Sequence, residues 1–246
     1  METQQYLDQL AQNSERLADV AAVAGVDAPV PTCPGWTVTD LLDHMIRGDL
    51  WARTIVEQGK RGITDRVLPE APADQPEGEA LVPYFRDGAK ALVDALASTD
   101  ASTPVWTFGA HDRTAAFWQR RRAQETAVHR VDAESAAGTP TPVDADLAVD
   151  GVDEFLVVFL PRLADNFAAV GDGTLHFHCT DADGEWLVAM REGRPTVTRE
   201  HAKGDVAARG TASDLVLFLW GRAPADSLEI FGDADLLGRF REAIRV

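Results

Sequence analysis

Hydrophobic residues recur at three- and four-residue spacings through most of the first half of the chain. This period is typical of amphipathic helices, and it predicts helices over about residues 3–24, 37–58, 78–98 and 114–137. The second helix has the clearest start signal, because Thr37 and Asp40 have the spacing of a capping box. Four such helices joined by loops favour an antiparallel bundle.

The pattern changes after the proline-rich segment 138–142. Residues 174–179 alternate with period two, as half-buried strands do. Further strands are expected at 185–190, 195–199 and 228–231, and helices at 146–165, 211–221 and 233–244. The chain therefore reads as an α+β protein, with a helical bundle over residues 1–142 and a smaller α+β domain with an antiparallel sheet over residues 143–246.

Composition narrows the classes of partner. The 246 residues are 45% hydrophobic and 26% charged, as in ordinary globular proteins. A net charge of −17, from 23 basic and 40 acidic side chains, argues against nucleic acid and membrane partners, which need clustered Lys and Arg. With two cysteines, no signal-peptide pattern and no bilayer-length apolar run, we expect a reduced, cytoplasmic protein, as a monomer or small homo-oligomer.

Candidate metal ligands occur on the second and fourth predicted helices. Glu125 and His129 are four residues apart, so they share one helix face. His44 falls on the inward face of the second helix, next to Met45. Two imidazoles and a carboxylate match the three-ligand pattern of catalytic zinc, and they also suit nickel, iron or manganese. Spacing alone leaves open an intrahelical ion pair for Glu125 and His129, and a core role for His44.

Three longer motifs extend this pattern in a fixed order. They are CPGWTVTDLLDH at residues 33–44, FWQRRRAQETAVHRVDAE at residues 117–134, and DGVDEF at residues 150–155, with GTASDLVLFLWGR following at residues 210–222. In this combination the chain resembles the family of mycothiol-dependent maleylpyruvate isomerases over nearly its whole length.

The resemblance implies a DinB-like metal-binding four-helix bundle followed by a sterol-carrier-like domain. It puts His44, Glu125 and His129 on the family's metal-ligand positions, with zinc as the usual metal. It also implies mycothiol as thiol cosubstrate, and either cis-trans isomerisation of the maleylpyruvate type or thiol S-transfer to small electrophiles. Arg222 matches an arginine thought to reach the active site from the C-terminal domain. Val131 departs from the aromatic residue usual in the family, so we expect it to affect the substrate pocket.

Several other residues have two interpretations. Arg122, on the ligand face, either binds a substrate carboxylate or forms an ion pair. His176 and His178 share a strand face, but no third ligand is evident in the sequence, which favours surface or edge-strand histidines. Cys33 at a helix start is either a reactive thiol or a small packed residue, and His111 either lines the metal site or belongs to an ordinary turn.

The leading hypothesis is a metal-dependent and thiol-dependent enzyme. A coordinated thiol loses its proton, and Arg222 would neutralise charge on a carboxylate or developing enolate. Two alternatives are a non-catalytic protein that binds a metal and a small ligand, and a metal-dependent hydrolase with water in the open coordination position.

Overall fold

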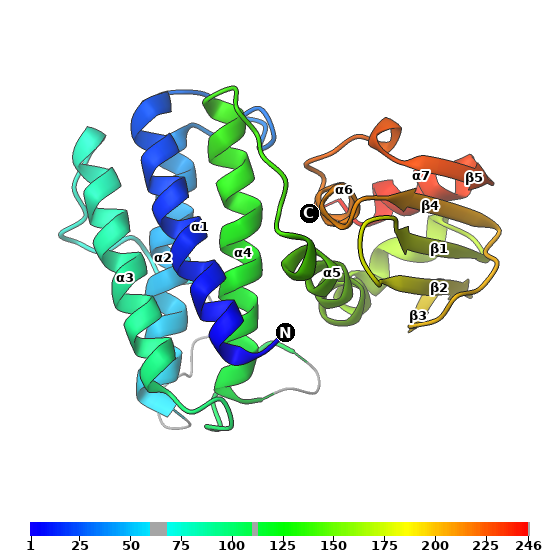
Figure 1. Cartoon of the computed structure of the whole chain (residues 1–246), viewed down its shortest axis with the longest axis horizontal. Helices are drawn as coiled ribbons and strands as arrows, with labels where there is room; N and C mark the ends of the chain where they lie inside the picture. Colours follow the sequence, from blue (N-terminus) through cyan, green and yellow to red (C-terminus); the bar gives the residue numbers. More distant parts are fainter. Residues whose placement is uncertain (60–67, 110–112, 246) are drawn as a thin grey trace. The chain divides into compact units, whose positions relative to one another are not determined.

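The computed structural model describes residues 1–59, 68–109 and 113–245, apart from the side chains of 164–165. The chain forms two compact units, Met1–Thr141 and Pro142–Val246 (Figure 1). Within the described ranges, no helix combines the length and the apolar character that a bilayer span requires.

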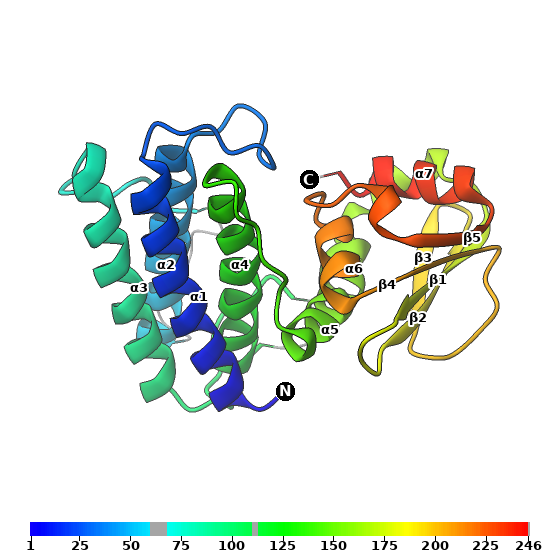
Figure 2. The same ribbon diagram turned by 45° about the horizontal axis from the view of Figure 1, so that its top comes forward.

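The first unit is a bundle of four long helices, which lie side by side in both views (Figures 1 and 2). They are α1 (Thr3–Ala24), α2 (Val38–Gln58), α3 (Leu81–Ser98) and α4 (Ala115–Ala136). The short 3₁₀ helix η2 (Gly78–Ala80) directly precedes α3. The predicted capping box starts α2, because Asp40 accepts from the Thr37 backbone N–H and its own N–H donates to the Thr37 hydroxyl. Gly59 ends this helix with a positive φ of 58°. The four predicted helices are confirmed.

Helix α4 differs from the other three in what it buries. Helices α1, α2 and α3 bury mainly apolar stripes, such as Leu17, Leu41 and Phe85. Helix α4 is buried around most of its circumference, and its buried residues include many polar and charged ones. These are Gln119, Arg121, Arg122, Gln124, Thr126, His129, Arg130, Asp132 and Glu134. Because buried polar groups need partners, α4 is where the bundle concentrates its hydrogen bonds and ion pairs.

The second unit begins with three consecutive helical segments. Helix α5 (Ala145–Glu154) continues as the π-helical turn η3 (Phe155–Phe159) and the 3₁₀ segment η4 (Leu160–Ala169). The sequence predicts one α-helix here. The change of helix type coincides with Pro161, which lacks a backbone N–H and clashes with the preceding turn.

A five-stranded sheet follows, in the order β3-β2-β1-β4-β5. Its strands are β1 (Gly173–Cys179), β2 (Glu185–Arg191), β3 (Arg194–Thr198), β4 (Val206–Gly210) and β5 (Glu229–Gly232). The expectation of an antiparallel sheet is wrong for one pair, since β4 runs parallel to β1. The pair is parallel because the chain leaves β3 at one edge of the sheet and returns on the other side of β1. The sequence did not predict β4, because this Ala- and Gly-rich strand lacks the alternation of polar and apolar residues that indicates a strand.

Helices cover one face of this sheet. Helix α6 (Ala212–Leu219) packs on β1 and β4, and α7 (Ala234–Ala243) packs on β4. The short 3₁₀ helix η5 (Ala225–Ser227) lies in the connection from α6 to β5. The ring of Phe177 on β1 lies 5.9 Å from that of Phe240 on α7, and the Trp186 indole on β2 donates to Asp153 on α5. Because side chains alternate along a strand, His176 and His178 project from the opposite face.

Candidate metal centre

Helices α2 and α4 bring the three predicted metal ligands together. The Oε1 atom of Glu125 lies 3.1 Å from Nε2 of His44 and 3.3 Å from Nε2 of His129. The imidazole centroids are 4.8 Å apart, and one ligand atom from each of the three residues lies within 4.8 Å of the other two. Residues 81 positions apart in sequence thus offer two nitrogens and one oxygen to a common point. Their role as metal ligands stays a prediction.

Arg121 fixes the orientation of the Glu125 carboxylate. It lies one helical turn before Glu125, and its guanidinium pairs with Oε2, the oxygen that the histidines do not contact. Burial alone would raise the pKa of Glu125, but Arg121 and the hydrogen bonds with His129 and His44 hold that pKa well below its ordinary value. The carboxylate is therefore ionised, as a metal ligand must be.

Asp132 is a site residue to which the sequence assigned no role. Its Oδ2 lies 2.8 Å from Nδ1 of His129, and its other oxygen accepts from the Thr32 hydroxyl at 2.6 Å. The Cys33 thiol donates to Oδ2 as well, at 3.3 Å. With Asp132 on Nδ1, the Nε2 atom of the same ring faces Glu125. A carboxylate on the far nitrogen is the usual outer partner of a metal-binding histidine. Its spacing of three residues after His129 was the available signal.

Trp36, from the motif before α2, packs against both imidazoles. Its ring centroid lies 5.3 Å from that of His44 and 6.4 Å from that of His129, and it is nearly parallel to the latter. The indole thereby shields one side of the ring pair from water.

Arg122 forms the ion pair that the sequence left open as its alternative. Its Nη2 donates to Oδ1 of Asp49 on α2 at 2.6 Å, and both side chains are buried. Burial raises the pKa of Asp49, against the opposing effect of Arg122. Gly48 makes room for this pair, because a Cβ there would lie 2.8 Å from Nη1 of Arg122. Arg122 thus joins α4 to α2 at a point one helical turn before Glu125 on α4.

The remaining candidates fall elsewhere. Arg222 lies just after α6, where its Nη1 donates to the Trp220 carbonyl at 2.7 Å. Its catalytic role stays a prediction, and His111 lies outside the described residues. Cys33 and Cys179 are both buried thiols, and burial raises the pKa of Cys179 to about 12. Val131 is buried on α4.

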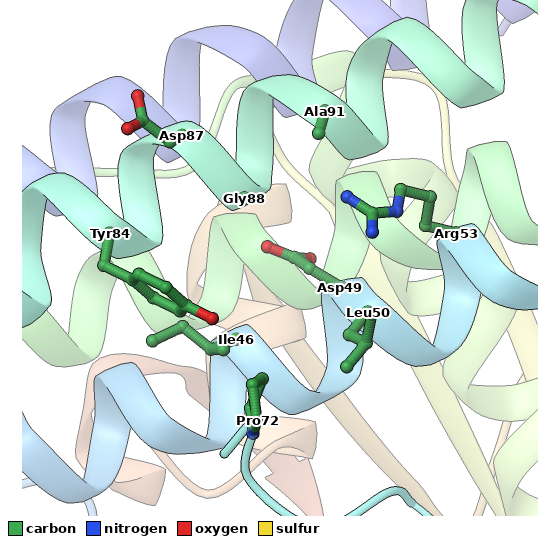
Figure 3. Close-up of a pocket in the computed structure, with 9 residues that line it drawn as sticks. All are labelled: Ile46, Asp49, Leu50, Arg53, Pro72, Tyr84, Asp87, Gly88 and Ala91. Carbon is green, nitrogen blue, oxygen red and sulfur yellow. The ribbon is translucent and has the colours of Figure 1, made fainter. Parts of the chain in front are cut away.

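A cavity of about 320 Å³ lies between α2 and α3 in the same unit. Figure 3 shows Asp49, Leu50 and Arg53 of α2 facing Tyr84 of α3 around it, with Pro72 at one side. None of the three candidate ligands lines this cavity. Asp49 lines the cavity and also forms the ion pair with Arg122, so this side chain connects the cavity to α4.

Comparison with known proteins gives the same two-part division. Residues 7–134 match the model of the mycothiol maleylpyruvate isomerase N-terminal domain, and residues 146–239 match its C-terminal domain. Two crystal structures are similar over 94% of this chain and 93% of theirs: a single-residue mutant of the mycothiol-dependent maleylpyruvate isomerase (14% identity, TM-score 0.66) and the unmutated enzyme (16%, 0.59). At these identities, the two structures establish the fold. Curated protein sequences give no match.

Proposed function

The chain belongs to the mycothiol maleylpyruvate isomerase family, and from this membership we propose that it is a metal-dependent cis-trans isomerase. Its cosubstrate would be mycothiol or a similar low-molecular-weight thiol, and its substrate a small electrophile with an activated cis double bond. The observation that supports metal dependence is the convergence of His44, Glu125 and His129 on one point.

This donor set fits a divalent ion such as zinc. Two imidazole nitrogens and one carboxylate oxygen are the protein ligands of many catalytic zinc sites, which keep a further position open. A bound ion of this kind lowers the pKa of a coordinated thiol, so that the thiol is present as thiolate at neutral pH.

The neighbouring side chains prepare these ligands. Arg121 holds one oxygen of Glu125, which leaves the other directed at the imidazoles. Asp132 holds Nδ1 of His129, which fixes the tautomer of that ring. Trp36 keeps water from one side of the two rings and so strengthens the electrostatic interactions there.

A thiolate isomerises such a substrate by reversible addition. The sulfur adds to one alkene carbon as the π electrons move into the conjugated carbonyl, giving an enolate. Rotation about the new single bond follows. The enolate then re-forms the double bond and expels the thiolate, so no atoms are gained or lost. We predict that Arg222 neutralises the enolate or a substrate carboxylate, on the basis of the resemblance of its motif alone.

The test is a thiol-dependent isomerisation assay. With zinc and mycothiol, the purified chain should convert maleylpyruvate to its trans isomer. Glu125→Gln and His129→Ala should lower turnover at least about 100-fold, whereas Glu57→Gln, an exposed carboxylate on α2, should not. Arg222→Ala should lower turnover without changing the metal content. No conversion above that by the thiol and zinc alone would refute the proposal.

Mass spectrometry of the same reaction separates the related activities. Accumulation of a stable thiol conjugate would identify a thiol S-transferase, and product formation without any thiol would identify a hydrolase or another metal-dependent reaction. Zinc binding without turnover of any of these substrates would favour a binding protein.

A further inference from the structure

A second cluster of ligand-type side chains lies in the C-terminal unit, on the sheet face opposite α7. Oε2 of Glu185 lies 3.0 Å from Nε2 of His176, 3.2 Å from Nδ1 of His178 and 2.5 Å from Nδ1 of His201. One ligand atom from each of these four residues lies within 4.8 Å of the other three. The cluster therefore has four donors directed at one point.

The register of the sheet fixes three of the four potential ligands. His178 on β1 lies directly opposite Glu185 on β2, in an antiparallel pair. His176 precedes His178 by two residues and shares its face of the strand. These three residues are thus held by the ladder between adjacent strands, which is a rigid support for a binding site.

The connection from β3 to β4 brings in the fourth donor. His201 lies in segment 199–205, which returns across the sheet to β4. This segment passes close to the β1 backbone, because a Cβ on Gly204 would lie 3.0 Å from the His176 nitrogen and from the Thr174 carbonyl oxygen. The His176 side chain is only 7% exposed, whereas that of His201 is 79% exposed.

We propose that His176, His178, Glu185 and His201 form a second metal site, selective for a late first-row divalent ion such as zinc. A single carboxylate oxygen has two lone pairs, so it cannot satisfy three imidazoles equally well by hydrogen bonds alone. A cation at the common point would satisfy all four groups. Three imidazoles and a carboxylate are ligands that zinc, nickel and copper favour.

The number of ligands distinguishes this site from the one in the bundle. Four protein ligands complete a tetrahedral zinc shell, which is typical of structural sites. In such a shell the ligand atoms lie about 3.4 Å apart, so modest rotations of the present side chains would close it. The ion would tie segment 199–205 to β1 and β2. This proposal does not depend on the activity proposed for the bundle.

Zinc stoichiometry of the full chain tests the proposal. We expect the His44→Ala/His129→Ala variant to retain one tightly bound zinc in equilibrium dialysis. Adding His178→Ala and His201→Ala should weaken that binding at least 100-fold, and both positions are accessible enough for the fold to tolerate the change. Glu185→Gln should weaken it at least 10-fold, whereas Glu200→Gln, an exposed neighbour of His201, should not.

A proteolytic readout reports on this site directly. Arg199 and Lys203 flank His201 and are trypsin cleavage points. Zinc should slow cleavage at both at least fivefold in the native chain and in the His44→Ala/His129→Ala variant, but not in His201→Ala. Either of two results would overturn the second site: no zinc bound to the His44→Ala/His129→Ala variant, or binding that His178→Ala and His201→Ala change less than threefold. Neither result bears on isomerase activity.

Discussion

Oδ2 of Asp132 lies 2.8 Å from Nδ1 of His129, so a fully buried carboxylate contacts the imidazole of one of the three proposed ligands. Asp132→Asn keeps the size of the side chain but removes the charge that orients and polarises the ring. We expect zinc affinity of the bundle site to fall about 10- to 100-fold, measured by competition with a chelator. The His178→Ala/His201→Ala background removes the second proposed site from this measurement.

A matched control for Asp132→Asn is Asp43→Asn, next to His44 in sequence but paired with Arg47. It should leave zinc affinity unchanged. An affinity within threefold of the parent for Asp132→Asn would show that the contact has no role in metal binding.

The Arg121–Glu125 pair predicts a stability effect that depends on metal. Arg121→Met leaves the Glu125 carboxylate without its guanidinium, and removing one partner of a buried pair costs about 3 kcal/mol. A bound cation restores part of the lost compensation. Urea unfolding should therefore show a large loss of stability without zinc and a smaller loss with zinc. An equal loss under both conditions would contradict the prediction.

The buried Glu134 carboxylate predicts a pH-dependent stability of the bundle. Arg16, Arg130 and Thr141 all donate to it, and they hold its pKa below the ordinary value of 4.5 despite its burial. A lowered pKa in the folded state adds stability above the unfolded pKa, and this stability is lost as the pH falls through the folded pKa.

Glu134→Gln should therefore destabilise the chain by about 2–3 kcal/mol at neutral pH. The difference from the parent should shrink below about pH 4.5, as the parent carboxyl becomes protonated. Urea unfolding at several pH values measures both effects, with Glu242→Gln as an exposed carboxylate control. A stability difference between the parent and Glu134→Gln that stays constant down to pH 3 would argue against the Glu134 carboxylate as the source of the pH dependence.

Cys179 is expected to be inert in the native protein. Burial raises the pKa of its thiol to about 12, and the thiolate is the reactive form. Alkylation by iodoacetamide at pH 8, followed by peptide mass spectrometry, should be at least about 100-fold slower in the native chain than in urea. Rapid native labelling of Cys179 would show that the strand end opens readily.

Local signals in the sequence predicted what depends on local physics. The apolar stripe of residues 3–24 and the Thr37–Asp40 capping box each mark their helix because neighbouring residues alone determine them. The spacing of Glu125 and His129 likewise places both on one face of α4. Pairing them with His44 on α2 required a packing arrangement, which the resemblance supplied and spacing did not.

Long-range geometry accounts for what the sequence left unpredicted. Strand β4 depends on the parallel neighbour β1 rather than on its own alternation. His201 contacts Glu185 because the segment between β3 and β4 passes beside β1. The sequence does not show this path, and so it did not predict His201 as a further ligand beside His176 and His178. Arg121 and Asp132 were visible on α4, but only the observed rotamers show which side chain each one holds.

Gly48 determines how closely Arg122 of α4 can approach α2. It lies one helical turn after His44, at the level where Arg122 crosses from α4, and a single added methyl group would collide with that guanidinium. For the metal ion that we propose between His44 and the α4 ligands, the available space would therefore depend on the interhelical distance as well as on ligand chemistry. Under this proposal, a residue that touches no ion would contribute to selectivity among ions of different radius.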